Sequence, residues 1–157
     1  CEVVNFYTRL NAGVVGMDAV LAAPFRALLP RRTKAKPCRE VGAFHTSPFS
    51  DTAKAVDGIV KEQKFSKPDF PLYCGSDGRR HSLPAELKRR FVRAVDGPVL
   101  WEEVLKAMLK DGVRTFVELA PGAMITEFIC DLPSDAEVLR TDTPENFRRA
   151  VRRLAGR

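Results

Sequence analysis

The chain has 157 residues, of which 45% are apolar and 29% are charged, a composition typical of one globular domain and not of a disordered chain. Its longest apolar stretch, residues 12–29, is interrupted by Asp18, Pro24 and Arg26, so it differs from the roughly 20 uninterrupted apolar residues of a membrane span. The net charge of +6 leaves an acidic or anionic partner open, and we expect no membrane partner.

The first 44 residues are predicted to form a small α+β unit. The expected elements are a strand at 2–7, a strand at 11–16, a helix at 18–29 and a strand at 38–44. The two first strands are joined by a short polar link, which indicates a hairpin. Pro24 must kink or shorten the helix because proline lacks a backbone N–H. The last strand runs into His45.

Beyond residue 44 the pattern changes to helices that alternate with strands. Helices are expected at 50–63, 84–95, 101–108, 124–129 and from 144 onward, and strands at 70–74, 115–119 and 138–139. The apolar stripe expected on the 50–63 helix consists of Ala55, Val56, Ile59 and Val60. Alternation of this kind favours an α/β fold with a parallel sheet.

The four cysteines lie far apart, and the chain has no Cys-x-x-Cys pair. We therefore expect no metal site. Cys74 and Cys130 fall in apolar strand and helix patterns, which predicts buried, reduced thiols and a reducing compartment.

Five arginines crowd the last ten residues, which raises nucleic acid as a partner. Four apolar residues there follow helical spacing, namely Phe147, Ala150, Val151 and Leu154. The arginines then occupy the solvent-facing sides of an amphipathic helix, and we expect no nucleic-acid partner.

Histidine 45 is the best local candidate for chemistry. It stands where the apolar segment 41–44 gives way to the small polar residues Thr46 and Ser47, and ends of strands are where α/β proteins place reactive groups. His81 lies in a charged segment, where exposure to solvent accounts for it. The chain contains no phosphate-binding loop and no Gly-x-Ser-x-Gly that would present a nucleophile.

Three spaced motifs carry a family resemblance. They are Gly42-Ala43-Phe44-His45-Thr46, Pro98-Val99-Leu100-Trp101 and Val117-Glu118-Leu119-Ala120-Pro121-Gly122. Together with the opening hairpin from Val4-Asn5-Phe6 to Gly16, they make the chain resemble the C-terminal half of the malonyl-CoA:acyl-carrier-protein transacylases.

The resemblance implies that His45 is the general base for a serine nucleophile that this chain lacks. A malonyl-serine intermediate would form from malonyl-CoA and pass to the phosphopantetheine thiol of acyl carrier protein. Phe44 is similar to the pattern of malonyl-selective members, and Asn5 keeps the family pattern in the hairpin. These two residues and Ala94 are expected at the substrate-binding site. The expected partners are acyl carrier protein, malonyl-CoA as substrate, and the missing N-terminal half of the same domain; no cofactor is expected.

The resemblance also implies an architecture and a location. Residues 1–44 are expected to be part of a ferredoxin-like small subdomain, and residues 45–157 the C-terminal part of a large, partial α/β-hydrolase-like domain. The chain alone is expected to be inactive, and its start is expected to be truncated. We expect a cytoplasmic protein, or one of the plastid or mitochondrial matrix in a eukaryote.

Departures from the family pattern keep a second hypothesis open. Tyr7, Arg9 and Asn11 replace the family's asparagine, proline and glutamine, and Ala94 stands where a glutamine is frequent. Ala94 serves if its backbone carbonyl orients His45, whereas activity suffers if a side chain is needed. The alternative is a degenerate, non-catalytic half that binds a carrier protein or a partner subunit.

Overall fold

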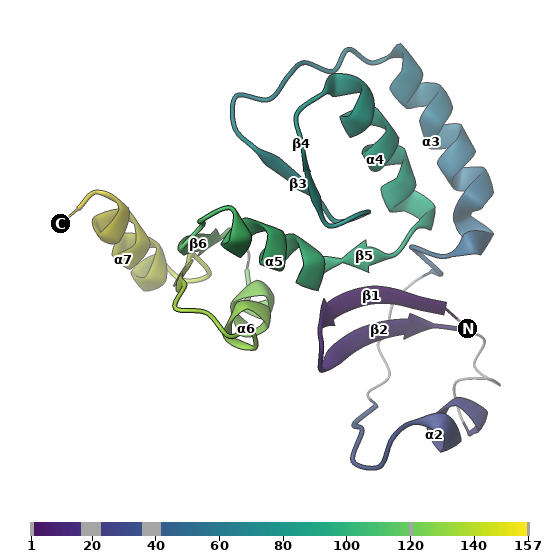
Figure 1. Ribbon diagram of the computed structural model, residues 1–157, viewed down its shortest axis with the longest axis horizontal. Coiled ribbons are helices and arrows are strands. Elements are labelled where there is room, and N and C mark those ends of the chain that lie inside the picture. The colour runs from purple at the N-terminus through teal and green to yellow at the C-terminus, as the bar shows by residue number, and fades with distance from the viewer. Residues whose placement is uncertain (1, 17–22, 36–41, 120, 157) are drawn as a thin grey trace.

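The computed structural model describes residues 2–16, 23–35, 42–119 and 121–156. Along the chain its elements are β1 (Glu2–Thr8), β2 (Asn11–Val15), α2 (Pro24–Leu28), the 3-10 helix η1 (Ser47–Phe49), α3 (Ser50–Glu62), β3 (Leu72–Cys74), β4 (Arg79–His81), α4 (Pro84–Asp96), β5 (Val99–Leu100), α5 (Trp101–Lys110), β6 (Thr115–Glu118), α6 (Met124–Cys130), β7 (Glu137–Arg140) and α7 (Pro144–Leu154). Helices and strands are mixed throughout, as an α/β chain requires (Figure 1).

Strand β1 lies at the centre of a sheet with the order β2-β1-β5. It pairs antiparallel with β2, so the predicted hairpin is confirmed, and parallel with β5 through Asn5–Val99 and Phe6–Leu100. Strands β6 and β7 form a second parallel pair, and β3 and β4 form an antiparallel hairpin. The predicted parallel pairing is therefore present in two places.

The main apolar core lies between α5 and α6. Leu105, Phe128 and Ile129 are buried there, with Trp101 and other apolar residues packed around them. The ring of Tyr7 stacks on that of Phe128 with centroids 4.7 Å apart. This contact fixes the β1–β2 hairpin against α6.

Several predicted elements need correction. Residues 18–22 and 38–41 lie outside the described residues, and α2 begins at Pro24, where proline's missing N–H is no loss. The end of the predicted 38–44 strand is not extended, because Gly42 has φ +126° and the chain turns there. In α3 the buried residues are Ala53 and Val60, whereas Ile59 is 64% exposed, since the face that meets α4 is offset from the predicted stripe.

The expectation for His81 was wrong. It lies on β4 and is only 8% exposed, with Nε2 2.9 Å from Asp77 and Nδ1 3.2 Å from Glu86. Arg90 also reaches Asp77, at 3.0 Å. The charged residues around His81 suggest a solvent-exposed loop, but in the fold they pair with one another, and such pairing allows a polar side chain to be buried.

Cys74 is half-buried and Cys130 is exposed, so the expected burial of the second thiol was wrong; both thiols are free. Burial raises the pKa of the Cys74 thiol. Cys130 ends α6 on the side away from the core, where helical periodicity turns it outward.

Helix α7 forms as predicted and begins at Pro144, with Thr143 accepting a hydrogen bond from Asn146 N at its start. Ala150 is buried, and Arg153 pairs with Glu137 of β7 at 2.9 Å.

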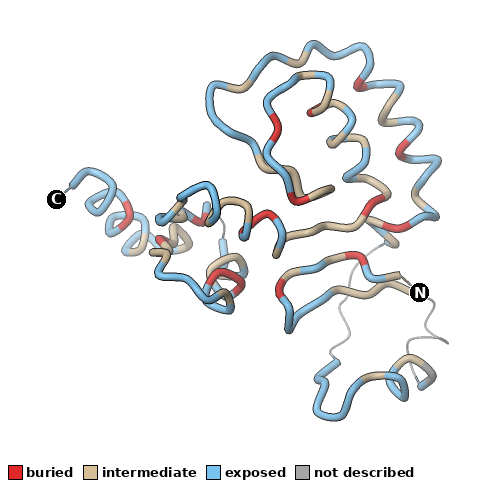
Figure 2. The backbone as a smooth tube through the Cα atoms, viewed as in Figure 1, coloured by how far each residue is buried: buried red, intermediate tan, exposed pale blue. Residues whose placement is uncertain are grey.

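Along the described part of the chain, buried residues are few and lie between longer exposed stretches (Figure 2). Across the described residues, every helix is too short or too polar to cross a membrane.

Candidate functional site

His45 occupies a tight turn between Gly42 and η1. Its φ of +62° is in the left-handed region, which a residue with a side chain rarely adopts. Its backbone N–H donates to the carbonyl of Val95 at 3.2 Å. Across the turn, the buried hydroxyl of Thr46 donates to the carbonyl of Ala43.

The imidazole of His45 is oriented by the end of α4. Its Nδ1 lies 2.8 Å from the backbone oxygen of Ala94. Because a carbonyl oxygen only accepts hydrogen bonds, Nδ1 must carry the proton in this contact. The neutral ring then has its lone pair on Nε2, the atom a general base uses to accept a proton.

Two backbone carbonyls in the last turn of α4 therefore face His45. The C-terminal end of a helix carries a partial negative charge, worth about 0.3–1 kcal/mol for a nearby cation. An imidazolium that forms at His45 is stabilised by this end of α4. The arrangement is that of a base held by a helix terminus instead of by a carboxylate.

Gly97 sets the geometry of that terminus. A Cβ at this position would lie 2.7 Å from the backbone oxygen of Arg93, so no larger residue fits without displacement. Pro98 follows and leads directly into β5, which pairs with β1. The end of α4 is thereby tied to the central sheet.

The other predicted site residues, Phe44 and Asn5, each pack against a residue other than His45. Phe44 is 48% exposed, and its ring packs 5.2 Å from that of Phe49. Asn5 lies in β1, with its side chain against Gly13 of the hairpin. The structure thus joins His45 to Ala94 by contact. Phe44 is next to His45 in the chain, and Asn5 lies on β1, beside Val99 of β5.

Glu2 was not predicted to belong to the site. Its carboxylate accepts from the hydroxyl of Ser47 at 2.6 Å and from the Ser47 backbone N–H at 3.1 Å. Hydrogen bonds from the Ser47 hydroxyl and N–H hold the pKa of Glu2 below its ordinary value. No sequence spacing reveals a contact between residues 45 apart, so only the fold could identify it.

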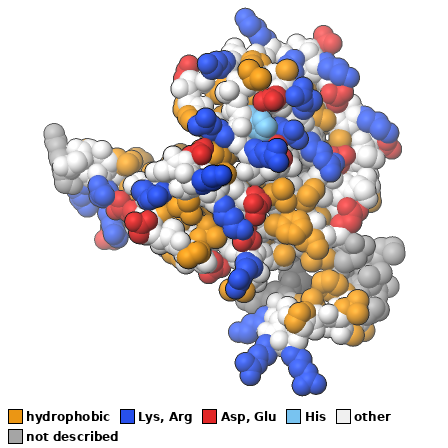
Figure 3. All heavy atoms as spheres, in the orientation of Figure 1, with side chains coloured by type: hydrophobic (Ala, Val, Ile, Leu, Met, Phe, Trp, Pro, Cys, Tyr) orange, Lys and Arg blue, Asp and Glu red, His pale blue; other side chains and the backbone are white. Residues whose placement is uncertain are grey.

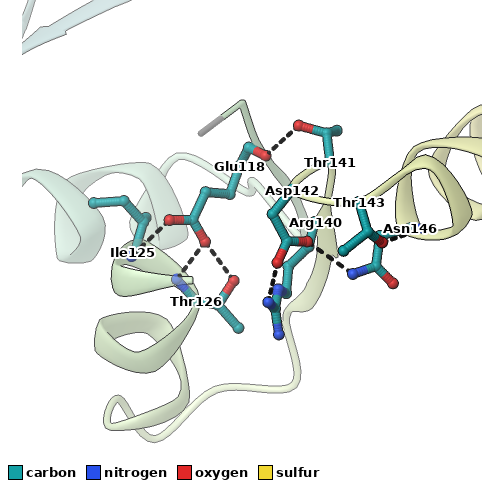
Figure 4. A network of polar contacts seen from close by, with 8 residues as sticks. All are labelled: Glu118, Ile125, Thr126, Arg140, Thr141, Asp142, Thr143 and Asn146. Atoms are coloured by element: carbon teal, nitrogen blue, oxygen red, sulfur yellow. Dashed lines mark hydrogen bonds and ion pairs between the residues drawn. The ribbon is translucent and has the colours of Figure 1, made fainter. Parts of the chain in front are cut away.

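A second polar network follows β6 and explains the glutamate of the third motif (Figure 4). The buried carboxylate of Glu118 accepts from the backbone N–H groups of Ile125 and Thr126, at 2.9 and 3.0 Å, and from the Thr126 hydroxyl. Burial alone would raise the pKa of Glu118, but these hydrogen bonds and nearby Arg140 outweigh it and lower the pKa. Glu118 is therefore the cap of α6.

Thr141 joins this network from the neighbouring strand end, where its hydroxyl donates to the backbone oxygen of Glu118 at 2.9 Å. Asp142 accepts from Asn146 at 2.7 Å and also contacts Arg140. Hydrogen bonds from Asn146 and Arg140 hold the pKa of Asp142 low. These contacts brace β6 and β7 against α6 and α7.

An open groove between α3 and α4 lies next to the His45 turn. Its lining mixes cations and anions, among them Lys54, Arg93 and Asp96. In the described ranges, His, Cys, Asp and Glu side chains nowhere gather in a group that could hold a metal ion. His45 with Ala94 remains the arrangement best suited to proton transfer.

No family model matches the chain. Among curated proteins, it is 21% identical to the malonyl CoA-acyl carrier protein transacylase of Bacillus subtilis over 121 residues, which is 77% of this chain and 38% of that protein. Among solved structures, it matches the malonyl-CoA:ACP transacylase of Synechocystis with a TM-score of 0.86 and 19% identity, over 94% of this chain and 50% of the other.

A second solved structure contains a type II polyketide acyl-carrier protein in complex with its malonyl-transacylase. This chain matches it with a TM-score of 0.87 and 18% identity, over 97% of its own length and 50% of the other. The chain thus spans half or less of these proteins. It has the α/β fold of that part of the transacylases, and the resemblance drawn from its three motifs is confirmed.

Proposed function

We propose that this chain is the C-terminal half of an acyltransferase that moves a malonyl group from malonyl-CoA to the phosphopantetheine thiol of acyl carrier protein. The nucleophilic serine would belong to the complementary N-terminal half. His45 would act as its general base. The observation that supports this role is the 2.8 Å contact between His45 Nδ1 and the Ala94 carbonyl, which leaves the Nε2 lone pair available.

The reaction would proceed in two balanced halves. The serine hydroxyl gives its proton to His45 Nε2 while its oxygen attacks the malonyl thioester. The tetrahedral intermediate expels the coenzyme A thiolate, which takes that proton from the imidazolium. The pantetheine thiol then gives its proton to Nε2 as its sulfur attacks the malonyl-serine, and the departing serine oxygen takes the proton back.

The departure at Ala94 is compatible with this chemistry. The contact to His45 comes from the backbone oxygen, so a residue of any side chain could provide it. Tyr7, another departure, packs on Phe128 in the core, which gives it a structural task. These two departures therefore do not argue for a degenerate binding module.

The remaining assignments belong to the same proposal. Phe44, exposed beside His45, and Asn5 on β1 would border the acyl group, and malonyl is the preferred acyl group. Residues 1–44 would belong to the small subdomain and residues 45–157 to the large one. The pathway would be fatty-acid or polyketide synthesis, in the cytoplasm or an organelle matrix.

Complementation tests the proposal. The chain is co-expressed with the N-terminal half of a related transacylase, and transfer of radiolabelled malonyl from coenzyme A to carrier protein is measured. His45→Ala should lower transfer by at least about a hundredfold, the usual scale for a general base. A stable complex that transfers no malonyl group would instead favour the binding module.

A further inference from the structure

We propose that Glu2 and Thr46 are positioning residues that hold His45 in its left-handed conformation, one from the start of β1 and one from within the turn. The inference rests on the proposed role of His45 as a base. It adds Glu2, which lies outside the three motifs, and it gives Thr46, the last residue of the first motif, a role of its own.

The conformation of His45 needs external support. A non-glycine residue with positive φ costs on the order of 1–3 kcal/mol and persists only where its surroundings fix it. His45 is fixed on one side by Val95, which accepts its N–H, and by Ala94, which accepts its Nδ1–H. Those bonds orient the residue only if the chain before and after it is also held.

Thr46 holds the turn from within. Thr46 is 2% exposed, and its hydroxyl donates to the carbonyl of Ala43, three residues earlier. Its own carbonyl accepts from Phe49 N at 3.0 Å, which starts η1. The Thr46 hydroxyl thus closes the turn that contains Phe44 and His45.

Glu2 holds the chain that leaves His45. Its carboxylate contacts both the N–H and the hydroxyl of Ser47, two residues after His45. Because β1 pairs with β5, and β5 follows α4, Glu2 and the Ala94 carbonyl are anchored to the same sheet. The base and its acceptor therefore move together.

Ionisation of Glu2 sets the pH range of this support. Its pKa is lowered in the folded chain, so the contact contributes fully above the ordinary glutamate value and is lost as pH falls through the lower, folded value. At neutral pH the support is complete. The pH profile of transfer near neutrality should therefore not depend on Glu2.

The direct test is NMR of the histidine rings in the complemented complex, with this chain labelled with ¹⁵N-histidine. Only His45 and His81 contribute, and His81 is an internal reference for folding. The wild type should show His45 protonated at Nδ1. Thr46→Val and Glu2→Ala should shift His45 toward the Nε2-protonated form with His81 unchanged, whereas Thr46→Ser should behave as wild type.

Transfer kinetics give the second readout. Thr46→Val should lower kcat about tenfold with KM changed less than about twofold, because a displaced base affects the transition state more than substrate binding. Exposed Thr115→Val and Glu62→Gln are matched controls and should have no effect.

His45 signals identical to wild type in both variants would overturn the inference, as would equal loss of the His45 and His81 signals in both. If the His45 signals shift as expected in the variants but the wild-type complex transfers no malonyl group, the positioning role is supported and the proposed function is contradicted. The two failures are therefore distinguishable.

Discussion

At the residue scale, the group that accepts the hydrogen bond from His45 is the backbone oxygen of residue 94. The side chain at position 94 is therefore not needed for this contact. Ala94 is exposed, and only its carbonyl contacts the imidazole. A helix carries its backbone oxygen in the same place whatever the side chain is. The alanine that differs from the family pattern is consequently compatible with the proposed catalysis.

Ala94→Gln should therefore leave the complemented enzyme nearly unchanged. Both residues are good helix formers, so α4 and its last carbonyls persist. We expect kcat/KM for malonyl transfer to stay within about twofold of wild type, since no transition-state contact is gained or lost. A gain of tenfold or more would mean that the glutamine side chain itself orients His45.

Gly97→Ala should weaken the fold and the site together. The added Cβ would lie 2.7 Å from Arg93 O, a helical carbonyl that cannot move freely. Such overpacking costs roughly 1–3 kcal/mol in the free energy of unfolding. Gly58→Ala is the matched control, because α3 leaves open space there and alanine favours a helix by about 0.5–1 kcal/mol.

Thermal unfolding of the complemented complex, followed by circular dichroism, compares the two variants. The melting temperature should fall for Gly97→Ala and rise slightly for Gly58→Ala. Equal melting temperatures for Gly97→Ala and wild type would contradict the close contact at the end of α4.

At the element scale, α6 depends on a cap supplied by another element. Its N-cap residue, Ala123, has no side chain that can accept a hydrogen bond. Glu118, at the end of β6, supplies the missing acceptor to two backbone N–H groups. The turn after β6 brings the start of α6 back to Glu118, so the Glu118 carboxylate joins the strand to the helix.

Glu118→Gln should destabilise the chain by about 1–3 kcal/mol, because an amide NH₂ would face backbone donors in a buried site. The folded pKa of Glu118 is lowered, so the stabilisation is present above the ordinary glutamate value and disappears as pH falls through the folded value. Denaturant unfolding at neutral and acidic pH should show the difference from wild type shrinking in acid.

Glu127→Gln is the control for charge alone. Glu127 lies exposed in the first turn of α6 and shares the helix terminus without capping it. Its effect should be a few tenths of a kcal/mol. Equal losses for the two variants would show that charge near the terminus matters and the cap does not.

The sequence predicts helices α4, α5 and α7 from their apolar spacing, but it predicts their buried faces less well. Helix α5 buries Val104 and Leu105 of the predicted face, whereas, of the described residues, α4 buries only Leu87 and α7 only Ala150. Strand β4 escaped prediction because its three residues are all basic or imidazole, and strand β5 because it has only two residues. For His81, sequence suggests solvent, and only tertiary contacts reveal two carboxylates around the ring.

The candidate site divides in the same way. His45 could be predicted because an apolar segment ends there and because a motif surrounds it. The possibility that Ala94 contributes its carbonyl was implied by the family resemblance, and the contact is present in the fold. Glu2 could not be found, since its partner is brought to it by the β1–β5 pairing.

At the scale of the whole molecule, many large apolar side chains remain in contact with solvent. Phe6 is 40% exposed, Phe91 57%, Phe147 54% and Leu119 81%. Apolar side chains reach the surface over much of the face drawn in Figure 3. Exposed large apolar side chains that gather in patches mark interaction sites in stable proteins. The proposed complementary half would cover part of it.

Assembly with that half should therefore change the physical behaviour of the chain before any chemistry is measured. Alone, the chain should bind the dye ANS and unfold over a broad temperature range, because exposed apolar surface accompanies weak cooperativity. With the complementary half, dye fluorescence should fall and unfolding should become a single sharp transition at higher temperature. His45→Ala should assemble equally well, which separates assembly from catalysis. A monodisperse monomer that binds no dye and melts cooperatively by itself would contradict the proposed partner, because no surface would then be left for it to stabilise.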